Sequence, residues 1–232
     1  LREDTTLVSL MLVNNEIGTL HPLAQVAAMA HERGALVHTD AVQAVGWFDT
    51  RVPTLAVDAL TLSGHKFGAP KGSGVAIVRD RLAIEPLIHG GGQEFERRSG
   101  TENVAWAIAV ATALEGLPTV IDDECERVTE LRDAFIDSIL RHVPSAELTG
   151  AQPGIPGRRH PAIASFVFPG INGETLLIEA EQRGVIVSSG SACSAGSDDP
   201  SHVLIACGFD DDTARTSVRV SMSHHTVAAA LI

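Results

Sequence analysis

Two apolar runs separated by a helix-length segment constrain the fold of this chain most strongly. Residues 7–13 (LVSLMLV) are apolar apart from one serine, as in a central parallel strand covered on both faces. Pro22 suits the first turn of a helix that extends to about Arg33, and Gly34 suits its end. The next apolar run begins at Ala35 and opens a second expected strand, residues 35–39. Strand, helix and strand in this order indicate a parallel α/β sheet.

The rest of the chain continues this alternation. A helix from near Thr101 to residue 111 is apolar nearly all round, which predicts that it is buried. We place a domain boundary near residue 117, so that residues 1–117 belong to a larger α/β domain and residues 118–232 to a smaller α+β domain. The further expected elements are strands at 59–62, 75–78, 163–168, 185–187 and 217–221, the start of a short helix at 41–45, and helices at 121–142 and 174–182.

The composition narrows the class of protein. With 232 residues and 44% hydrophobic side chains, the chain can bury a large core in one or two domains. A net charge of −12 argues against a nucleic-acid-binding surface, which needs clustered positive charge. No apolar run approaches a membrane span, and the first residues lack a secretory signal pattern. Three cysteines without paired or metal-like spacing favour the reducing cytoplasm over a secreted disulfide framework.

A lysine follows the expected strand at residues 59–62. The sequence there is Ser63-Gly64-His65-Lys66, followed by a loop rich in glycine and proline. Ligands of open α/β sheets bind at such strand ends, and burial beside an apolar strand would favour the neutral amine, which can form a Schiff base with a carbonyl. A loop in which Lys66 and Lys71 are solubilising charges is the other interpretation.

Asp40 ends the strand at residues 35–39, at the same sheet edge as Lys66. It can cap a helix that begins at Ala41, or bind a positively charged heterocycle. Gln43 lies three residues further on, on the same helix face. A lysine that binds an aldehyde and an aspartate that keeps a pyridine nitrogen protonated are the two side chains that pyridoxal phosphate requires.

Six separated motifs, in this order along most of the chain, carry a family resemblance. They are NNEIG at 14–18, HTDAVQAVG at 38–46, SGHK at 63–66, GGGQE at 90–94, RSGT at 98–101 and SSGSAC at 188–193. Together they resemble the pyridoxal-phosphate-dependent cysteine desulfurases of the NifS/IscS type, which are similar to class V aminotransferases. The resemblance implies a fold-type I transferase: a mostly parallel sheet with helices on both faces, and a smaller C-terminal α+β domain.

The resemblance also implies a role for each matched residue of the large domain. Lys66 is similar to the lysine that holds the cofactor covalently and moves protons at the substrate Cα. Asp40 resembles the partner of the pyridine nitrogen, and Gln43 the donor to the ring hydroxyl. Ser63 and His65 match residues that bind the cofactor phosphate.

Four further matches concern the substrate and the neighbouring subunit. Asn15 matches an asparagine beside the ring hydroxyl and the substrate, and Arg219 the arginine that binds the substrate carboxylate. Thr101 matches a threonine that contacts the phosphate of the cofactor bound in the other subunit, which implies a homodimer. Cys193 matches the active-site cysteine that takes sulfur from L-cysteine as a persulfide, releases L-alanine, and passes the sulfur to an acceptor or scaffold protein.

The cysteines can also be compared without the resemblance. Cys193 lies among small residues, which suits an exposed, reactive thiol. Cys125 lies among carboxylates, which disfavour a thiolate, and Cys207 lies in an apolar segment. We therefore expect Cys193 to be the nucleophile. No metal site is expected, because the adjacent His224 and His225 would point apart on a strand.

The chain also departs from the family. The family's glycine-threonine phosphate loop and its ring-stacking histidine are absent, the chain stops soon after His225, and Ser223 replaces a usual glycine. We therefore expect a fragment of a longer enzyme, or a second chain that completes it. A selenocysteine lyase, another class V enzyme or an aminotransferase remain alternatives, although an aminotransferase would not need Cys193. A truncated chain that serves only as a dimerisation or interaction module is the alternative of another class.

Overall fold

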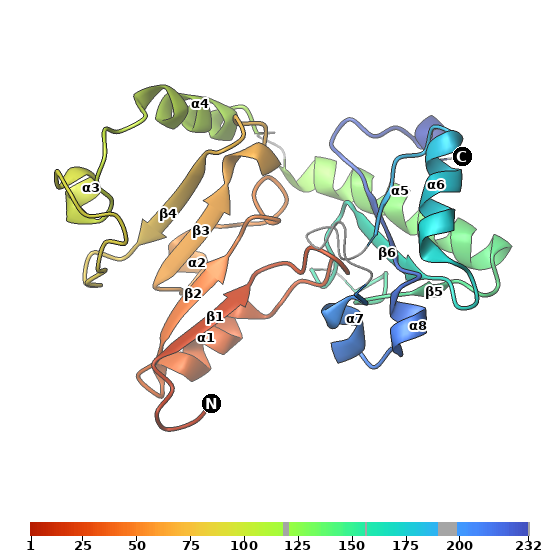
Figure 1. Cartoon of the computed structure of the whole chain (residues 1–232), viewed down its shortest axis with the longest axis horizontal. Helices are drawn as coiled ribbons and strands as arrows, with labels where there is room; N and C mark the ends of the chain where they lie inside the picture. Colours follow the sequence, from red (N-terminus) through yellow and green to blue (C-terminus); the bar gives the residue numbers. More distant parts are fainter. Residues whose placement is uncertain (118–120, 156, 190–198, 232) are drawn as a thin grey trace. The chain divides into compact units, whose positions relative to one another are not determined.

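The chain folds into two compact units, which are described separately. The computed structural model describes residues 1–117, 121–155, 157–189 and 199–231. The first unit comprises residues 1–12 and 22–119, and the second residues 13–21 and 120–232 (Figure 1). The segment 13–21, which the sequence places in the larger domain, thus packs within the second unit.

The first unit contains a four-stranded sheet in the order β1-β2-β3-β4. Strands β1, β2 and β3 are parallel and β4 is antiparallel to β3 (Figure 1). The expected parallel strands are therefore confirmed. The elements of this unit are β1 (Leu7–Met11), α1 (Leu23–His31), β2 (Leu36–Asp40), α2 (Val52–Leu55), β3 (Ala59–Ser63), the 3-10 helix η1 (Gly64–Lys66), β4 (Gly74–Val78), α3 (Gln93–Glu96) and α4 (Val104–Glu115).

One face of this sheet forms the core of the first unit. Val37, Thr39 and Leu60 are fully buried and alternate with more exposed neighbours, as expected for side chains on one face of a strand. Helix α1 packs against β2. It ends, as expected, before Gly34, which has a φ of +73° and lets the amide of Ala35 bond to the carbonyl of Ala30.

Three expected elements of this unit differ from the structure. Strand β1 lies at the edge of the sheet, with Leu7 56% exposed, and is not the central strand covered on both faces that was expected. Residues 41–45 form a turn and not a helix. The Ala44 amide donates to the carbonyl of Ala41, three residues earlier, whereas an α-helix joins residues that are four apart. Helix α4 is present, capped by the side chain of Asn103, but Val110 is its one buried residue. Val104 and Ile108 are 63% and 61% exposed. A helix that is apolar on all sides is expected to be buried, but its composition does not show which other element covers it.

A buried carboxylate lies just before β3. Asp58 has a fully buried side chain that accepts a hydrogen bond from the Val37 amide (2.9 Å) and pairs with His31 Nε2 (2.8 Å) and with Arg81. Burial alone would raise the pKa of Asp58, but the hydrogen bonds from His31, Val37 and Arg81 lower it to about 2. These three partners connect α1, β2 and the segment after β4.

Replacing Asp58 by asparagine is expected to lower the free energy of unfolding of the first unit by roughly 2–4 kcal/mol, because a buried charge and its hydrogen bonds are lost. The folded pKa is below the unfolded value of about 3.9, so the carboxylate stabilises fully above that pH. The difference between the two proteins should disappear as the pH falls from about 4 to about 2. Urea unfolding, followed by the fluorescence of Trp47 and Trp106, measures this difference in the free energy of unfolding at each pH.

The matched control is Asp49→Asn, which breaks the exposed pair between Asp49 and Arg51 in the same unit. It should cost less than about 1 kcal/mol, as exposed ion pairs do. Equal losses for the Asp58 and Asp49 variants would contradict the prediction.

The second unit contains a four-stranded sheet in the order β5-β6-β8-β7, in which every neighbouring pair is antiparallel. Its long helix α5 has the bounds expected from the sequence. The elements of this unit are α5 (Ile121–His142), β5 (Glu147–Leu148), β6 (Ile163–Val167), α6 (Gly173–Gln182), β7 (Ser188–Ser189), α7 (His202–Ala206), α8 (Asp211–Ala214), β8 (Val218–Ser221) and the 3-10 helix η3 (Ala228–Ala230).

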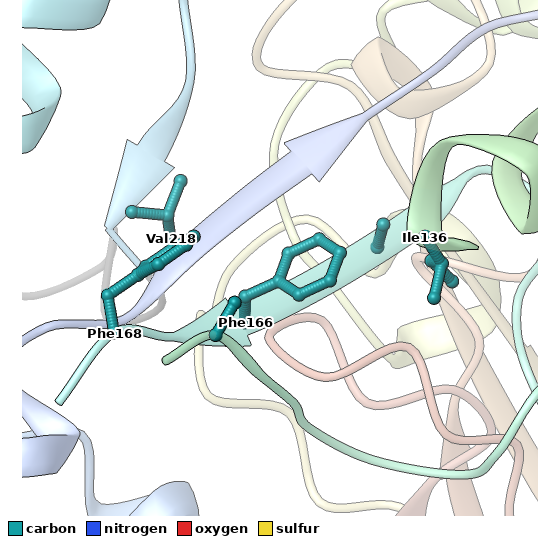
Figure 2. Close-up of a cluster of buried hydrophobic side chains, with 6 residues drawn as sticks. Ile136, Phe166, Phe168 and Val218 are labelled. Carbon is teal, nitrogen blue, oxygen red and sulfur yellow. The ribbon is translucent and has the colours of Figure 1, made fainter. Parts of the chain in front are cut away.

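The core of this unit lies between α5 and the sheet. Figure 2 shows Ile136 of α5, Val218 of β8, and Phe166 and Phe168 in and just after β6, all of which are buried. The rings of Phe166 and Phe168 have centroids 6.1 Å apart. Every residue of β6 is buried, and Ser165 is the one polar residue in it.

The short strand after α6 lies later than the sequence predicts. The expected strand at residues 185–187 is wrong, because the Val185 amide bonds to the Ala180 carbonyl and closes the end of α6. Ile186 is 88% exposed. The strand forms instead at β7, where Ser188 pairs with Arg219 and Ser189 with Val218. Among the described helices, none has the length and hydrophobicity that a membrane span needs.

Candidate active site

The expected site residues of the first unit lie at the carboxyl ends of β2 and β3. Asp40 is the last residue of β2 and pairs in register with Thr61 of β3, two residues before Ser63. His65 and Lys66 follow in η1. The parallel strands therefore bring the expected carboxylate, hydroxyl, imidazole and amine to one sheet edge, as ligand sites of α/β sheets require.

Asp40 has a local structural role and a free oxygen. One carboxylate oxygen accepts a hydrogen bond from the Val42 amide (2.8 Å), which fixes the turn that replaces the expected helix. The residues that the structure describes offer its other oxygen no hydrogen bond, and the side chain is exposed. Capping a turn and binding a ligand are thus compatible at Asp40. Gln43 is half-buried in the same turn.

The loop after β3 is folded tightly around Gly64. Its amide bonds to the carbonyl of Ser73, and a Cβ on Gly64 would lie 2.1 Å from the Ser73 hydroxyl, so a larger residue does not fit. Ser63 Oγ and His65 Nδ1 lie 2.9 Å apart. Lys66 is exposed, so the expectation that it is buried beside the apolar strand is wrong. It lies in a turn past the strand end and not in the strand.

Thr101 lies in the first unit, between α3 and α4, and is exposed. Its carbonyl and that of Gly100 accept hydrogen bonds from Arg98 (3.4 and 3.2 Å). The Gly100 amide donates to Gln93 Oε1 (2.9 Å). These contacts fix the backbone of the RSGT motif and leave the Thr101 side chain exposed.

Further expected site residues belong to the second unit, where residues 14–18 form a turn. Asn14 is buried, and its Oδ1 accepts hydrogen bonds from the amides of Glu16 and Ile17 (2.9 Å each). Gly18, with a φ of +69°, donates its amide to the Asn14 carbonyl (3.0 Å). The buried side chain of Ile17 anchors the turn in a core cluster. This turn places Asn15.

Arg219 of β8 binds this turn. Its Nη1 donates to the Asn15 carbonyl oxygen (2.8 Å), although the two residues are 204 positions apart in sequence. Its Nε is buried and has no hydrogen-bond partner among the described residues. A buried, unpaired guanidinium N–H is costly unless a ligand accepts from it, and a carboxylate is the natural acceptor.

A second arginine, Arg159, also binds the backbone of this turn. Arg159 is buried and donates to the carbonyls of Ile17 (3.3 Å), Ala151 (2.6 Å), Ile163 (3.2 Å) and Thr149. Burial lowers the pKa of Arg159 to about 10. Carbonyl oxygens from three segments thus converge on one guanidinium, which explains how residues 13–21 are held in the second unit.

Cys193 lies outside the described residues. The described chain before it ends in β7, whose Ser188 pairs with Arg219. The described chain after it leads into α7, whose N-terminal cap is Ser201. The segment that carries Cys193 therefore follows a strand that is paired with Arg219.

Sequence reasoning missed three residues of this region: Arg159, Glu16 and Ser201. The hydroxyl of Ser201 donates to Glu16 Oε2, and both residues are buried. Glu16 was visible within the NNEIG motif as its one charged residue, which was the signal that could have singled it out. The described residues contain no group of three or more potential metal ligands.

The chain matches one protein family over nearly its whole length. The model for aminotransferase class-V proteins matches residues 1–230. Cysteine desulfurase IscS of Dictyoglomus turgidum is 43% identical over 226 residues, which are 97% of this chain and 56% of that protein. The IscS-like cysteine desulfurase of Mycobacterium tuberculosis is 40% identical over 227 residues, 98% of this chain and 57% of that protein. The chain thus spans a little more than half the length of these relatives.

Solved structures agree with these relatives. A NifS-like protein has a TM-score of 0.86 at 33% identity, and the match covers all of this chain and 59% of that one. The NifS-like protein of Rickettsia africae has a TM-score of 0.82 at 28% identity, with 98% of this chain and 59% of that one covered. The expected fold class is confirmed, and the chain belongs to the aminotransferase class-V family, together with cysteine desulfurases of the NifS/IscS type.

Proposed function

We propose that this chain is the greater part of a pyridoxal-phosphate-dependent cysteine desulfurase. In the overall reaction, the C–S bond of L-cysteine breaks and an S–S bond forms to Cys193. The substrate Cβ, which has lost its sulfur, takes up a proton, so that the substrate leaves as L-alanine. Cys193 becomes a persulfide. The observation that carries the proposal is the gathering of Asp40, Ser63, His65 and Lys66 at the ends of β2 and β3, in a chain whose relatives are named cysteine desulfurases.

The side chains present fit this cofactor. Asp40 has one carboxylate oxygen without a hydrogen bond, which suits a pyridine N–H. Ser63 and His65 offer donors for a phosphate, and Lys66 is an exposed amine for the aldehyde. When bound, pyridoxal phosphate supplies a ring that accepts electrons from the substrate Cα.

Each residue then has a definite task. Asp40 would hold the proton of the ring nitrogen, and Gln43 and Asn15 would bind the ring hydroxyl. Lys66 would hold the cofactor through its aldehyde and would carry the proton of the substrate Cα. Arg219 binds the substrate carboxylate with the N–H groups that the Asn15 carbonyl leaves free. Cys193 attacks the substrate sulfur as a thiolate.

A homodimer is part of the proposal, with Thr101 lent to the cofactor phosphate of the other subunit. The region before Thr101 supports it with a surface that a partner would cover: Leu87 and Phe95 are 98% and 93% exposed. Residues 94–96 also have a left-handed backbone, which non-glycine residues rarely adopt without external contacts. A cytoplasmic location and transfer of the sulfur to an acceptor protein of an iron–sulfur assembly pathway complete the proposal.

Product analysis tests the proposed reaction. The chain, and any longer form of the protein that contains it, is supplied with pyridoxal phosphate, L-cysteine and a thiol reductant. Alanine and sulfide should form in equal amounts. Pyruvate with ammonia, or alanine without sulfide, would overturn the proposal. Parallel reactions with selenocysteine test the lyase alternative, which would release selenide but leave L-cysteine unchanged.

Replacing Arg219 by lysine is expected to raise the KM for L-cysteine roughly 100-fold, because a lysine cannot form a bidentate pair with the carboxylate. Cofactor binding should be unchanged. Steady-state kinetics measure the change. Arg215→Lys is the control: Arg215 is exposed, lies four residues earlier and pairs with Asp212. An unchanged KM in the Arg219 variant would contradict the assignment.

A further inference from the structure

Among the described residues, the side chain of Arg219 donates its hydrogen bond to one peptide group. The peptide between Asn15 and Glu16 has its carbonyl bonded to Arg219 Nη1 (2.8 Å) and its N–H bonded to Asn14 Oδ1 (2.9 Å). A peptide group is planar, so a rotation that moves one of these groups moves the other. Whatever fixes Glu16 therefore also fixes the carbonyl that orients Arg219.

The side chain of Glu16 is tied to a distant part of the second unit. Glu16 is 5% exposed, and its Oε2 accepts a hydrogen bond from the hydroxyl of Ser201, which is 2% exposed. Ser201 is also the N-cap of α7 and accepts from the Leu204 amide (3.2 Å). The serine hydroxyl thus donates to Glu16 and accepts from the helix, which leaves it one orientation.

The hydrogen bond between Glu16 and Ser201 is one of several contacts that hold the turn in place. Asn14 holds the amide side of the peptide, Ile17 anchors the chain in the core, and Glu16 connects the turn to α7. Burial of a carboxylate costs free energy that a hydrophobic residue would avoid. A glutamate at a buried position therefore needs a reason beyond packing, and the hydrogen bond to Ser201 supplies one.

We propose that Glu16 is a positioning residue for substrate recognition. Through Ser201 it fixes the peptide group that directs Arg219, and so it sets the affinity for the carboxylate of the substrate. The inference rests on the proposed function, in which Arg219 binds that carboxylate. It predicts an effect on substrates that carry a carboxylate and none on amines that lack one.

Binding titrations in the Cys193→Ala background test the proposal, because sulfur transfer is then stopped. The probes are L-cysteine and cysteamine, its analogue without the carboxylate, and each is titrated against the absorption of the bound cofactor. Glu16→Ala and Ser201→Ala should each weaken L-cysteine binding roughly five- to tenfold, the effect of one lost hydrogen bond. Cysteamine binding should stay within about twofold, as expected for a change that leaves its contacts intact.

Two further variants sharpen the test. Glu16→Gln retains a carbonyl oxygen for Ser201 and should restore L-cysteine binding. The double variant of Glu16 and Ser201 should be no weaker than either single variant, because both remove the same hydrogen bond. Asp210→Ala is the matched control, since it removes the N-cap of the neighbouring short helix α8, and the hydrogen bonds of the Asp210 side chain are to Thr213 of that helix. It should change neither affinity.

The outcomes separate this inference from the proposed function. Equal weakening of both probes, or weakening by Asp210→Ala, would show a general structural effect and overturn the inference. Unchanged L-cysteine binding in Glu16→Ala would overturn it as well. If the background protein responds to neither probe, the proposed function falls, and the inference falls with it.

Discussion

Replacing Lys66 by alanine is expected to abolish covalent capture of pyridoxal phosphate and to lower desulfurase activity by roughly 10³-fold or more. The amine of Lys66 is assigned both the covalent bond to the aldehyde and the transfer of the Cα proton, and alanine can do neither. Borohydride reduction followed by mass spectrometry of the peptides measures the first effect. The protein itself should carry the cofactor label on the peptide that contains Lys66, and the variant should carry none.

Lys71→Ala is the matched control for this experiment. Lys71 lies five residues later in the same loop and, like Lys66, is exposed. Replacing Lys71 removes one positive charge, as replacing Lys66 does, but leaves Lys66 in place. Cofactor labelling and activity should therefore remain. A label on Lys71, or covalent capture that persists in the Lys66 variant, would contradict the assignment and favour the view that both lysines are solubilising charges.

Replacing Cys193 by alanine is expected to eliminate the persulfide and all alanine formation, while cofactor binding stays unchanged. The thiol is assigned the attack on the substrate sulfur, and no other step of the proposed reaction uses it. Intact-protein mass spectrometry after a brief exposure to L-cysteine should show one added sulfur atom on the unchanged protein. The variant should show none, although its cofactor absorption still responds to L-cysteine.

The other two cysteines provide internal controls. Cys207 is exposed and Cys125 is half-buried, so accessibility alone would let either react. Replacement of each by alanine should leave the added sulfur atom and the alanine yield unchanged. Loss of the persulfide in the Cys207 variant, or loss of the cofactor in the Cys193 variant, would contradict the role given to Cys193.

Much of the first unit was predictable because its signals are local. The apolar runs, Pro22 and Gly34 indicate the strand, helix and strand that open the chain, and the structure has these two strands in parallel. Asp40 and Lys66 each follow such a strand, so their common sheet edge could be derived before the structure was known. Local turn chemistry was less predictable: the oxygen of Asp40 closes a turn where a helix was expected.

Exposure could not be derived in the same way. Helix α4 has the composition of a buried helix, but most of its residues are exposed, and Lys66 lies in a 3-10 turn outside the apolar strand. Hydrophobic periodicity reports which face of an element needs a partner. Whether a partner is present depends on the rest of the structure.

The sequence alone thus indicated the strand, helix and strand at the start of the first unit, the resemblance to the NifS/IscS enzymes and the residue types of the candidate site. The tertiary structure decided that the NNEIG segment packs in the second unit, that Arg219 donates to the carbonyl of Asn15, and that Ser201 donates to Glu16 across 185 residues of chain. Propensity and periodicity are properties of neighbouring residues. A hydrogen bond between residues so far apart forms only where the packing of the whole unit brings their polar groups together, so no local pattern encodes it.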